Sequence, residues 1–570
     1  MFTQVVVLSY QSPETDSFTY EIPKNLEGKI KIGQVISVPF GKRNPFGIVL
    51  SVNNNLPTTI KNIKPVISII LEKPILLPYQ IKLLKWLSGY YIAPMINCLK
   101  ALLPQFPKKL DNQQLTTNNQ QLTQTLILVP SLNHIPQVMS QFPQAKNYAV
   151  YTNELKTSEK FNVWQKILSG QVDFIFGSRS AIFSPCPNLK KIIIFDEHDG
   201  AFKDDRSPYF ATLTVAEKIS ELTGAQIEII DSSPKISTYF NSIRHSERAE
   251  ESRSFSLRLQ DDGEREVQTK TISLSRDRKL GNYSSISTDL EEIIKRAYSK
   301  KLSVLLFLNK KIESGSIFCK DCKHREFFKS QPEVCPNCQS AEIYFNSTNI
   351  NTLAREVKKI LPGAETNFIA EKTTNTRHQI PDTKITIATS AVFYKLHASK
   401  FDLVAHIYAD SPLNFNQYNS QEEIYSQITN LKKLTKKLLI IQTYNEELPA
   451  IKFAVLENYE AFYKSELGPR KLLNYPPFSL LVKITVSGRK ETDTEKKAQK
   501  LYRDLTNQLP VTILGPFAIN LQRTLSYNII LKNPLTSYSL NSRQAALNKI
   551  KNLIPTEKDL KIIVETKNLN

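Results

Sequence analysis

Glycine, methionine, tryptophan and cysteine are scarce in this sequence, with 16 Gly, 3 Met, 2 Trp and 6 Cys among 570 residues. Six cysteines in so long a chain argue against a disulfide-stabilised scaffold. No run reaches the roughly 20 consecutive apolar residues of a membrane-spanning helix. The first ten residues, MFTQVVVLSY, lack the basic start and the apolar length of a secretory signal. We therefore expect a cytoplasmic protein.

The tripeptides Gly-Lys-Ser and Gly-Lys-Thr are also missing, and with them the usual end of a phosphate-binding loop. This absence matters because NLKKIIIFDEHD, residues 188–199, has the pattern of a buried strand followed by an acidic box. In nucleotide-driven motors such a box supplies one acid that holds Mg²⁺ and another that orients the attacking water. Asp196 and Glu197 are the candidates for these catalytic positions. The alternative is an acidic strand end of an α/β sheet that binds no nucleotide.

Basic residues outnumber acidic ones, with 74 Lys and Arg against 54 Asp and Glu, which gives a net charge of +20. An excess of this size is typical of proteins that bind a polyanion such as nucleic acid. A basic, solvated surface without such a partner is the alternative, and charge alone does not decide between the two.

Composition and hydrophobic periodicity divide the chain into six segments and predict a multidomain α/β fold. Short apolar runs at 5–8, 35–38 and 47–52 predict strands, and a helical pattern then ends at Pro94. Two later segments alternate apolar strands with helices, as in doubly wound parallel sheets. The segments are 1–105 (small and β-rich), 106–124 (polar linker), 125–240 (first α/β lobe), 241–270 (Ser-, Arg- and Glu-rich insertion, disordered or weakly helical), 271–444 (second α/β lobe) and 445–570 (α+β domain).

Four of the six cysteines form two Cys-x-x-Cys pairs with twelve residues between them. Two such pairs at this separation can close one tetrahedral thiolate site. A site with four thiolates has no open position, so the zinc ion it predicts is structural. Its ligands would be Cys319, Cys322, Cys335 and Cys338, in a zinc ribbon at 317–340. Cys98 and Cys186 stand apart, and we expect both to be buried thiols.

Several segments resemble the PriA family (primosomal protein N′), whose members restart stalled replication forks. The resemblance covers most of the chain. It rests on VPFG with a later GIV (38–41 and 47–49), LILVPSLNHIPQVMSQF (126–142), GSRSAIFSPCPNL (177–189), DEHDGAFKDDRSPYFA (196–211), VLLFLNKK (304–311), CKDC and CPNC, and NYPPFS (474–479). It implies a 3′-DNA-end-binding domain at 1–105, RecA-like helicase lobes at 125–240 and 271–444, and a C-terminal domain. In the family the outer two cysteine pairs share one zinc ion, and the ligands of a second zinc ion are missing here.

The sequence departs from the family where the family binds ATP. A winged-helix domain and the phosphate loop have no counterpart between the first domain and residue 125, so lobe 1 is truncated. Phe195 stands in place of the first acid of the box, and IDSSPK (230–235) replaces GSATPS. Ala388, Thr389 and Ser390 replace a Gly-Thr-Gln loop. Leu431 and Leu434 stand in place of the two arginines that reach the γ-phosphate. We therefore do not expect the family's cofactors, ATP and Mg²⁺, to be used here.

The resemblance also implies residues that contact DNA. Phe18, Thr19 and Tyr20 match a Phe-Asp-Tyr triplet that holds the 3′ end, and Gly41 matches a glycine whose backbone approaches the nucleotide. The alternative for the two aromatic residues is that they pack the domain core. The remaining candidates are basic: Lys42 and Arg43 on the following loop, Lys64 near the pocket, and Arg179 in a loop that touches the strand. Lys42 and Arg43 are equally consistent with a solvated hairpin tip.

These features together indicate a PriA-like replication restart protein that binds forked or single-stranded DNA without helicase activity of its own. The partners implied by the resemblance are forked and single-stranded DNA, primosome and helicase-loading proteins, and single-stranded-DNA-binding protein, with a nucleoid association. Two alternatives stay open at this stage. One is an active ATP-dependent 3′→5′ DNA helicase with divergent motifs, and the other is a decayed scaffold that only contacts other proteins.

Overall fold

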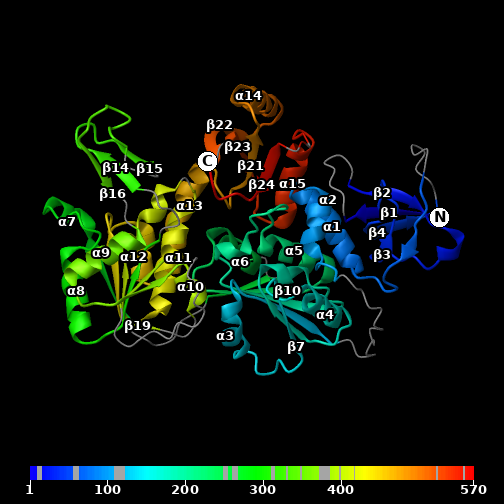
Figure 1. The fold of residues 1–570 in the computed structure, drawn as a ribbon, viewed down its shortest axis with the longest axis horizontal. Helices are drawn as coiled ribbons and strands as arrows, with labels where there is room; N and C mark the ends of the chain where they lie inside the picture. The colour runs from blue at the N-terminus through cyan, green and yellow to red at the C-terminus, as the bar shows by residue number, and fades with distance from the viewer. Residues whose placement is uncertain are drawn as a thin grey trace. The chain divides into compact units, whose positions relative to one another are not determined.

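A computed structural model describes residues 1–8, 16–54, 63–107, 122–247, 255–259, 267–309, 315–328, 332–346, 349–370, 385–396, 400–415, 417–521, 524–555, 557 and 559–569. These residues form two compact units (Figure 1). The first comprises residues 1–260 and 467–570, and the second comprises residues 261–466. The boundary near the C-terminal part falls inside helix α13 (Tyr459–Leu472), not at residue 445. Most of the linker predicted at 106–124 lies outside the described residues.

The N-terminal part of the first unit is a five-stranded antiparallel sheet in the order β2-β1-β4-β3-β5. Side chains alternate between its faces, as they must along any strand. One face packs Val5, Ile36 and Val49 into a small core of its own. The other face turns Val6 and Ile48 towards helices α1 (Pro78–Tyr90) and α2 (Met95–Leu102). The strands are β1 (Phe2–Val7), β2 (Phe18–Glu21), β3 (Val35–Ser37), β4 (Phe46–Asn53) and β5 (Ser68–Ile69), with a 3-10 turn η1 (Lys24–Leu26), and they confirm the three predicted runs.

The next part of the first unit is a six-stranded parallel sheet in the order β11-β10-β9-β6-β8-β7. Helices cover both faces. Trp164 of α4 and Val215 of α5 pack on one face, and Val138 of α3 packs with Phe176 on the other. The elements are β6 (Gln124–Leu128), η2 (Leu132–His134), α3 (Ile135–Met139), β7 (Tyr148–Tyr151), α4 (Thr157–Leu168), β8 (Phe174–Gly177), η3 (Arg179–Phe183), β9 (Leu189–Phe195), η4 (Gly200–Phe202), α5 (Thr212–Thr223), β10 (Gln226–Asp231), α6 (Ile236–Glu247) and β11 (Phe255–Leu259).

The insertion predicted at 241–270 to be disordered or weakly helical is helical at its start and contains strands further on, over the residues that the structure describes. Helix α6 continues to Glu247, and β11 pairs in parallel with β10 at the edge of the sheet. Phe255 and Leu257 pack against the core of the first unit, and Arg258 forms an ion pair with Glu228. The alternation Phe-Ser-Leu-Arg-Leu carries the strand signal, but the Ser-, Arg- and Glu-rich composition around it obscures that signal. Residues 248–254 and 260–266 lie outside the described residues.

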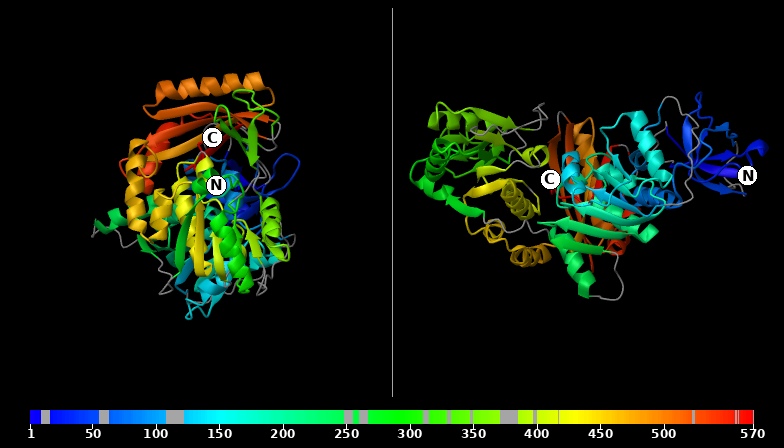
Figure 2. Two further views of the ribbon diagram at one scale, coloured as in Figure 1. Left: turned by 90° about the vertical axis from the view of Figure 1, so that its left-hand side faces the viewer. Right: turned by 90° about the horizontal axis from the view of Figure 1, so that it is seen from below.

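The C-terminal part of the first unit has the element order β-α-β-β-α-β, and its antiparallel sheet has the order β22-β23-β21-β24. This is a ferredoxin-like arrangement. Helix α14 lies along the sheet in Figure 2, and Leu501 and Leu505 point from it into the same core as Val482. The elements are β21 (Ser479–Ser487), α14 (Glu491–Gln508), β22 (Thr512–Leu521), β23 (Thr524–Pro534), α15 (Leu540–Lys551) and β24 (Leu560–Val564).

The second unit contains a six-stranded parallel sheet in the order β12-β20-β19-β13-β18-β17, and helices lie on both of its faces (Figure 1). A separate antiparallel sheet, β15-β14-β16, carries the cysteine cluster. The elements are β12 (Gln268–Ser273), α7 (Leu274–Lys279), α8 (Thr288–Ser299), β13 (Val304–Phe307), β14 (Gly315–Cys319), β15 (Arg325–Phe328), β16 (Ile343–Asn346), α9 (Ile350–Ile360), β17 (Thr366–Ile369), β18 (Ile385–Ala388), α10 (Val392–Lys395), β19 (Phe401–His406), η5 (Ser411–Asn414), α11 (Ser420–Lys433), β20 (Thr435–Thr443) and α12 (Pro449–Val455).

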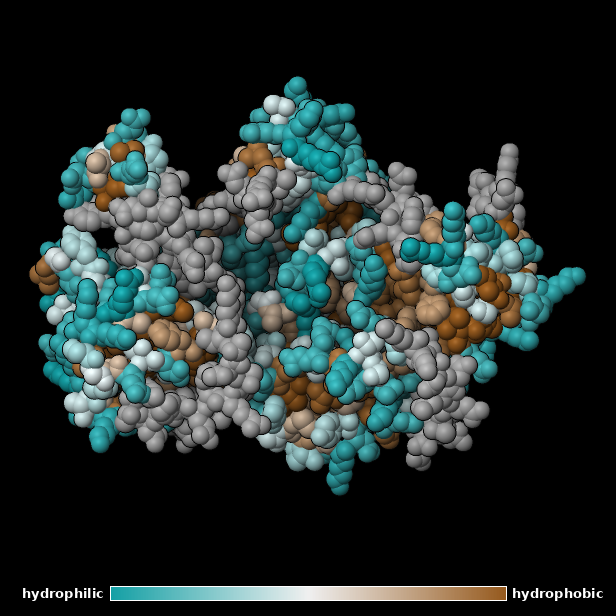
Figure 3. All heavy atoms as spheres, in the orientation of Figure 1, coloured by the Kyte–Doolittle hydropathy of each residue, from teal (hydrophilic) through white to brown (hydrophobic). Residues whose placement is uncertain are grey.

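Hydrophilic side chains predominate on the face drawn in Figure 3, and apolar ones gather in separate patches. Over the described ranges, no helix has both the length and the apolar character needed to cross a bilayer. Cys98 and Cys186 are both buried, as expected from the sequence, and burial raises the pKa of each thiol.

His406, the last residue of β19, is completely buried beside the ring of Phe307. Neither of its ring nitrogens has a hydrogen-bond partner among the described residues. Burial lowers the pKa of His406 to about 3, against about 6.5 in an unfolded chain. The unfolded chain therefore binds the proton more readily, so this group leaves stability intact above pH 6.5 and reduces it as the pH falls towards 3.

We expect the variant His406→Leu to lose this acid sensitivity. Between pH 7 and pH 5 the wild-type second unit should lose about 2 kcal/mol more unfolding free energy than the variant, as the two pKa values require. Urea unfolding at both pH values measures the difference. Thr386→Val is the matched control, since it removes another buried polar atom without a partner that does not titrate. Equal pH dependence in wild type and His406→Leu would contradict the assignment.

Candidate functional site

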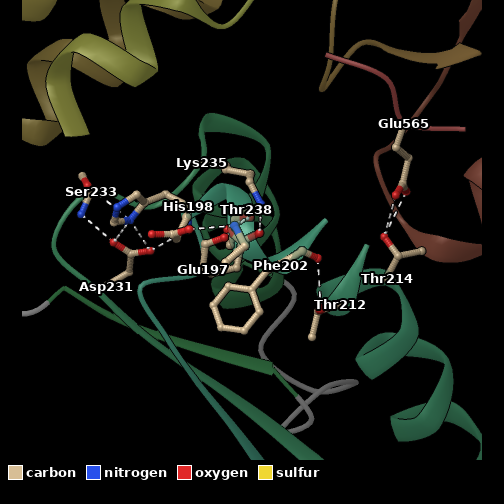
Figure 4. A network of polar contacts seen from close by, with 12 residues as sticks. Glu197, His198, Phe202, Thr212, Thr214, Asp231, Ser233, Lys235, Thr238 and Glu565 are labelled. Atoms are coloured by element: carbon tan, nitrogen blue, oxygen red, sulfur yellow. Dashed lines mark hydrogen bonds and ion pairs between the residues drawn. The ribbon is translucent and has the colours of Figure 1, made fainter. Parts of the chain in front are cut away.

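The acidic box lies directly after β9, at the carboxyl end of the parallel sheet where α/β proteins bind ligands. Asp196 adopts a positive φ of 49° and turns the chain sharply. Glu197 is almost fully buried, with 2% exposure. Its carboxylate forms an ion pair with Lys235, which also donates to the Glu197 carbonyl oxygen at 3.0 Å. Thr238 donates to the other carboxylate oxygen at 3.0 Å (Figure 4). Glu197, which corresponds to the acid that orients water in a motor, thus bonds to two side chains of this protein, Lys235 and Thr238.

His198 forms the second half of this polar network. Its Nδ1 lies 2.7 and 2.9 Å from the two carboxylate oxygens of Asp231, and its backbone N–H donates to the same carboxylate at 3.0 Å. The backbone N–H of Ser233 also donates to Asp231, at 2.8 Å (Figure 4). Burial works to lower the pKa of His198, but Asp231 outweighs it and raises that pKa. Burial raises the pKa of Asp231, but the His198 charge and the hydrogen bonds from His198 and Ser233 together outweigh burial and lower that pKa. We therefore assign an ion pair with a charged imidazole.

These residues do not fit a magnesium–nucleotide site. Ligand atoms of Asp196, His198 and Asp231 lie within 4.8 Å of one another, but Mg²⁺ favours an all-oxygen octahedral set, and the imidazole Nδ1 already faces Asp231. The Lys235 ammonium group contacts the Glu197 carboxylate, as a metal ion would in a magnesium site. In the second unit, Leu431 and Leu434 are both buried in α11 and at its end, so neither position presents a charge to a phosphate. Lys432 beside them pairs with Glu457.

The four clustered cysteines come together as the sequence predicts. The sulfur atoms of Cys319 and Cys338 are 3.5 Å apart and those of Cys322 and Cys335 are 3.6 Å apart, and all four lie within 4.8 Å of one another. Cys319 and Cys335 are buried. Each pair sits on the same kind of turn, because the residue four positions after the first cysteine, Lys323 or Gln339, has a positive φ near 60°. This thiolate cage fits one tetrahedral zinc ion.

The thiols of the cage differ in acidity. The side chain of Asn337 hydrogen-bonds Cys322 and lowers its pKa to about 6. The backbone N–H of Ser340 lowers the pKa of Cys338, but hydrogen bonds to the three other cage sulfurs, together with burial, outweigh it and raise that pKa to about 12. Protons shared among the thiols must leave before a metal ion binds, so zinc affinity should rise with pH.

The N-terminal candidates gather only in part. Tyr20 is buried, with 4% exposure, and its hydroxyl lies 3.4 Å from the Pro39 carbonyl oxygen. Phe18 packs edge-on against Phe40 at 5.1 Å between ring centroids. Both side chains belong to the small core of the sheet, which favours the packing role. Thr19 lies between them on β2 and therefore turns its side chain to the opposite face. The triplet does not converge on one pocket.

The basic candidates lie on loops between strands of this sheet. Gly41 and Lys42 form the tip of a tight hairpin, closed by paired backbone hydrogen bonds between Phe40 and Arg43 of 2.8 and 3.1 Å. Gly41 has a φ of 60°, which favours glycine, and there is open space around it. The carbonyl oxygen of Lys64 accepts from the backbone of β2 at 3.0 Å. Lys42, Arg43 and Lys64 are exposed, so three cations lie on the two loops that follow β3 and precede β5.

Arg179 has partners inside the first unit. Its guanidinium donates to the carbonyl oxygens of Ala201 and Lys203 at 3.0 and 2.5 Å and lies 3.3 Å from the Asp204 carboxylate. These bonds hold the loop 201–204 against η3. A contact between this side chain and DNA stays a prediction. Lys235 and Thr238 were missed by the sequence reading, although the lysine that replaces the last serine of the family motif was a visible signal.

Comparison with known proteins agrees with this architecture. The PriA 3′DNA-binding domain model matches residues 5–104, and the model of the primosomal protein N C-terminal domain matches residues 471–565. Replication restart protein PriA of Synechocystis sp. is 26% identical over 77% of this chain and 58% of its own length. The corresponding figures are 26%, 70% and 54% for PriA of Bacillus subtilis, and 24%, 87% and 89% for PriA of Rickettsia conorii. The chain thus spans little more than half the length of the first two relatives. RecG bound to a three-way DNA junction is similar at a TM-score of 0.35 and 11% identity, over 69% of this chain and 46% of RecG.

Two doubly wound lobes, a four-cysteine ribbon and a 3′DNA-binding domain define a multidomain α/β protein with a nucleic-acid-binding module. Both domain models and the curated relatives point to one family. Residues 5–104 and 471–565 match two domains of the PriA family of replication restart proteins, and the chain is similar to PriA proteins over most of its length.

Proposed function

We propose that this protein binds forked or single-stranded DNA in replication restart and does so without hydrolysing ATP. The observation that carries the proposal is the PriA 3′DNA-binding domain match at 5–104. In this domain Gly41 lies at an open hairpin tip beside exposed Lys42 and Arg43, and exposed Lys64 lies on the loop before β5. A backbone that approaches a terminal nucleotide there, with cations for the phosphates, is the arrangement that such a role requires. The net charge of +20 supports the same partner.

Two observations support the proposed absence of ATP hydrolysis. No phosphate loop is present in the sequence, and Glu197 is occupied by Lys235 and Thr238. The remaining role of such a protein would be to bind a fork and to position other factors on it. By resemblance, these factors would be primosome and helicase-loading proteins and single-stranded-DNA-binding protein, which act on DNA in the nucleoid.

We expect purified protein to bind a fork with a free 3′ hydroxyl at its branch about fivefold more tightly than the same fork with a 3′ phosphate, as one lost hydrogen bond implies. ATP hydrolysis should stay at the level of a blank without enzyme, with or without the fork. Fluorescence anisotropy and phosphate release measure the two quantities. If turnover is stimulated by DNA and abolished in Glu197→Gln, the protein is a divergent helicase. If neither fork binds, the DNA-binding proposal is wrong.

A further inference from the structure

A cluster of aromatic and basic residues lies at the carboxyl edge of the parallel sheet in the second unit, outside the residues discussed so far. Tyr444 follows β20, Tyr408 follows β19, and helix α7 follows β12. Because the strands are parallel, these three strand ends meet at the same edge, the edge at which open α/β sheets bind ligands. We call Tyr444, Tyr408, Tyr283, Arg278 and their exposed neighbours Arg276 and Lys279 the tyrosine platform.

Tyr444 is held in one orientation from several directions. Its backbone N–H donates to the Asp410 carboxylate at 2.5 Å, and its carbonyl oxygen accepts from the Ser275 hydroxyl at 3.0 Å. Its phenolic oxygen accepts from Arg278 at 3.3 and 3.4 Å. Its ring lies parallel to that of Tyr408, with 3° between the planes and 6.3 Å between the centroids.

Despite these anchors, the Tyr444 side chain is not a core residue, since 44% of it is exposed. Tyr283, with 63% exposure, also contacts Arg278, whose guanidinium is 6.0 Å from the Tyr283 ring centroid and 5.9 Å from that of Tyr444. A ring that is fixed at its backbone and at its hydroxyl but left open to solvent has lost its rotamer freedom before any partner arrives. Such preorganisation lowers the entropy cost of stacking against a planar ligand.

Three cations, Arg276, Arg278 and Lys279, belong to the platform, and several acids lie close to it. Arg276 and Lys279 are exposed on α7. The nearest acids serve the fold: Asp277 is buried and accepts from the backbone N–H of Thr288 at 2.8 Å, and Asp410 accepts from Tyr444. Glu446 and Glu447 follow Tyr444 on the way to α12, where Glu447 pairs with Lys452 at 3.0 Å.

We propose that the tyrosine platform binds single-stranded DNA by stacking a base on Tyr444, with Arg276 and Lys279 contacting the adjoining phosphates. Exposed aromatic rings among cations are the combination that holds unpaired bases without regard to sequence. A duplex offers no free base face, so the platform selects single strands. The inference rests on the proposed DNA-binding function, and it adds a site in the second unit that needs no 3′ end.

The test uses the full-length protein and a fluorescent oligothymidine of about 20 nucleotides. A phosphate blocks the 3′ hydroxyl of this oligothymidine, so that recognition of a free 3′ end does not contribute. Tyr444→Ala should weaken binding about tenfold, because stacking is worth roughly 1–3 kcal/mol per base. Tyr444→Phe keeps the ring and should stay within about threefold of wild type. Tyr148→Ala removes a tyrosine of similar exposure, 48%, in the first unit and should change nothing.

The salt dependence separates stacking from phosphate contacts. Arg276→Gln and Lys279→Gln should each reduce the slope of log affinity against log salt by about 0.7, whereas Tyr444→Ala should leave the slope unchanged. Equal affinity of Tyr444→Ala and wild type would overturn the platform and leave 3′-end binding intact. If wild type binds the free-3′-end fork but not the blocked oligothymidine, the platform is wrong as well. If wild type binds neither, both proposals fall.

Discussion

Replacing Cys335 by serine is expected to reduce the zinc content of the purified protein from one ion per chain to none. The Cys335 sulfur is fully buried and lies 3.6 Å from that of Cys322, so its loss opens the cage to water on its inner side. A hydroxyl is a poor substitute for a thiolate ligand. Structural zinc is worth about 10–16 kcal/mol in small zinc-binding peptides, and the three short strands β14 to β16 offer little other core. We therefore expect the ribbon itself to unfold.

Metal analysis by mass spectrometry, together with proteolysis of the ribbon, measures both effects. Cys98→Ala is the matched control, because Cys98 is equally buried but lies outside the cage, and it should retain one zinc ion. Two zinc ions or none in wild type would refute the four-thiolate assignment. Zinc retained at full occupancy in Cys335→Ser would show that this sulfur is not a ligand.

Replacing Arg543 by methionine is expected to destabilise the first unit by about 3–5 kcal/mol. Arg543, on α15, is buried between carboxylates from two other elements: it pairs with Glu217 of α5 and, at 2.5 Å, with Glu565 after β24. Glu565 also accepts from Tyr90 of α1 at 2.9 Å. It accepts from Thr214 at 2.9 Å as well (Figure 4). Removing the one arginine leaves buried carboxylates without their main counter-ion, which is the costly way to break a buried pair.

The acids of this cluster respond differently to their surroundings. Burial raises the pKa of Glu217. Burial acts in the same direction on Glu565, but the charges of Arg543 and Lys203 outweigh it and lower that pKa. In Arg543→Met we expect the cluster to take up a proton near neutral pH, because a buried carboxylate without a cation favours its neutral form.

Urea unfolding followed by a probe in the first unit measures the loss. Lys549→Met is the matched control, since Lys549 is an exposed cation on the same helix, and its effect should stay within about 0.5 kcal/mol. A similarly small effect for Arg543→Met would mean that the carboxylates find other partners. Because the cluster joins α1, α5, α15 and the C-terminal strand, its loss should also loosen the 3′DNA-binding domain from the rest of the unit.

The proposed role, binding a fork without hydrolysing ATP, would benefit from such rigidity. In an ATP-driven motor the acidic box must exchange ligands in every cycle, whereas here Lys235 and Thr238 both bond to the Glu197 carboxylate. The same helix, α6, reaches the C-terminal part of the unit, where Asn241 donates to the Tyr538 carbonyl oxygen at 3.2 Å and Phe240 packs on Phe478. The box is thus tied into the structural framework of the first unit.

Local sequence patterns were sufficient to predict several structural features of this protein. The spacing of Cys319, Cys322, Cys335 and Cys338 was enough to predict the cage, because two short turns fix the relative positions of four sulfurs. Apolar runs gave the strands of both lobes, and the missing phosphate loop was visible as an absence. The alternation in Phe255–Leu259 was lost in its polar surroundings, because a five-residue strand gains its stability from the neighbour it pairs with.

Only the tertiary structure decided what the remaining candidates do. Tyr20 faces the core and Thr19 the opposite side, which depends on the pairing of β2 with β1. Arg179 is engaged by carbonyl oxygens some 20 residues away, and Lys235 reaches an acid 38 residues earlier in the chain. The platform around Tyr444 joins segments that are 166 residues apart. Sequence spacing cannot give such contacts, because they are set by which strand ends the sheet brings to one edge.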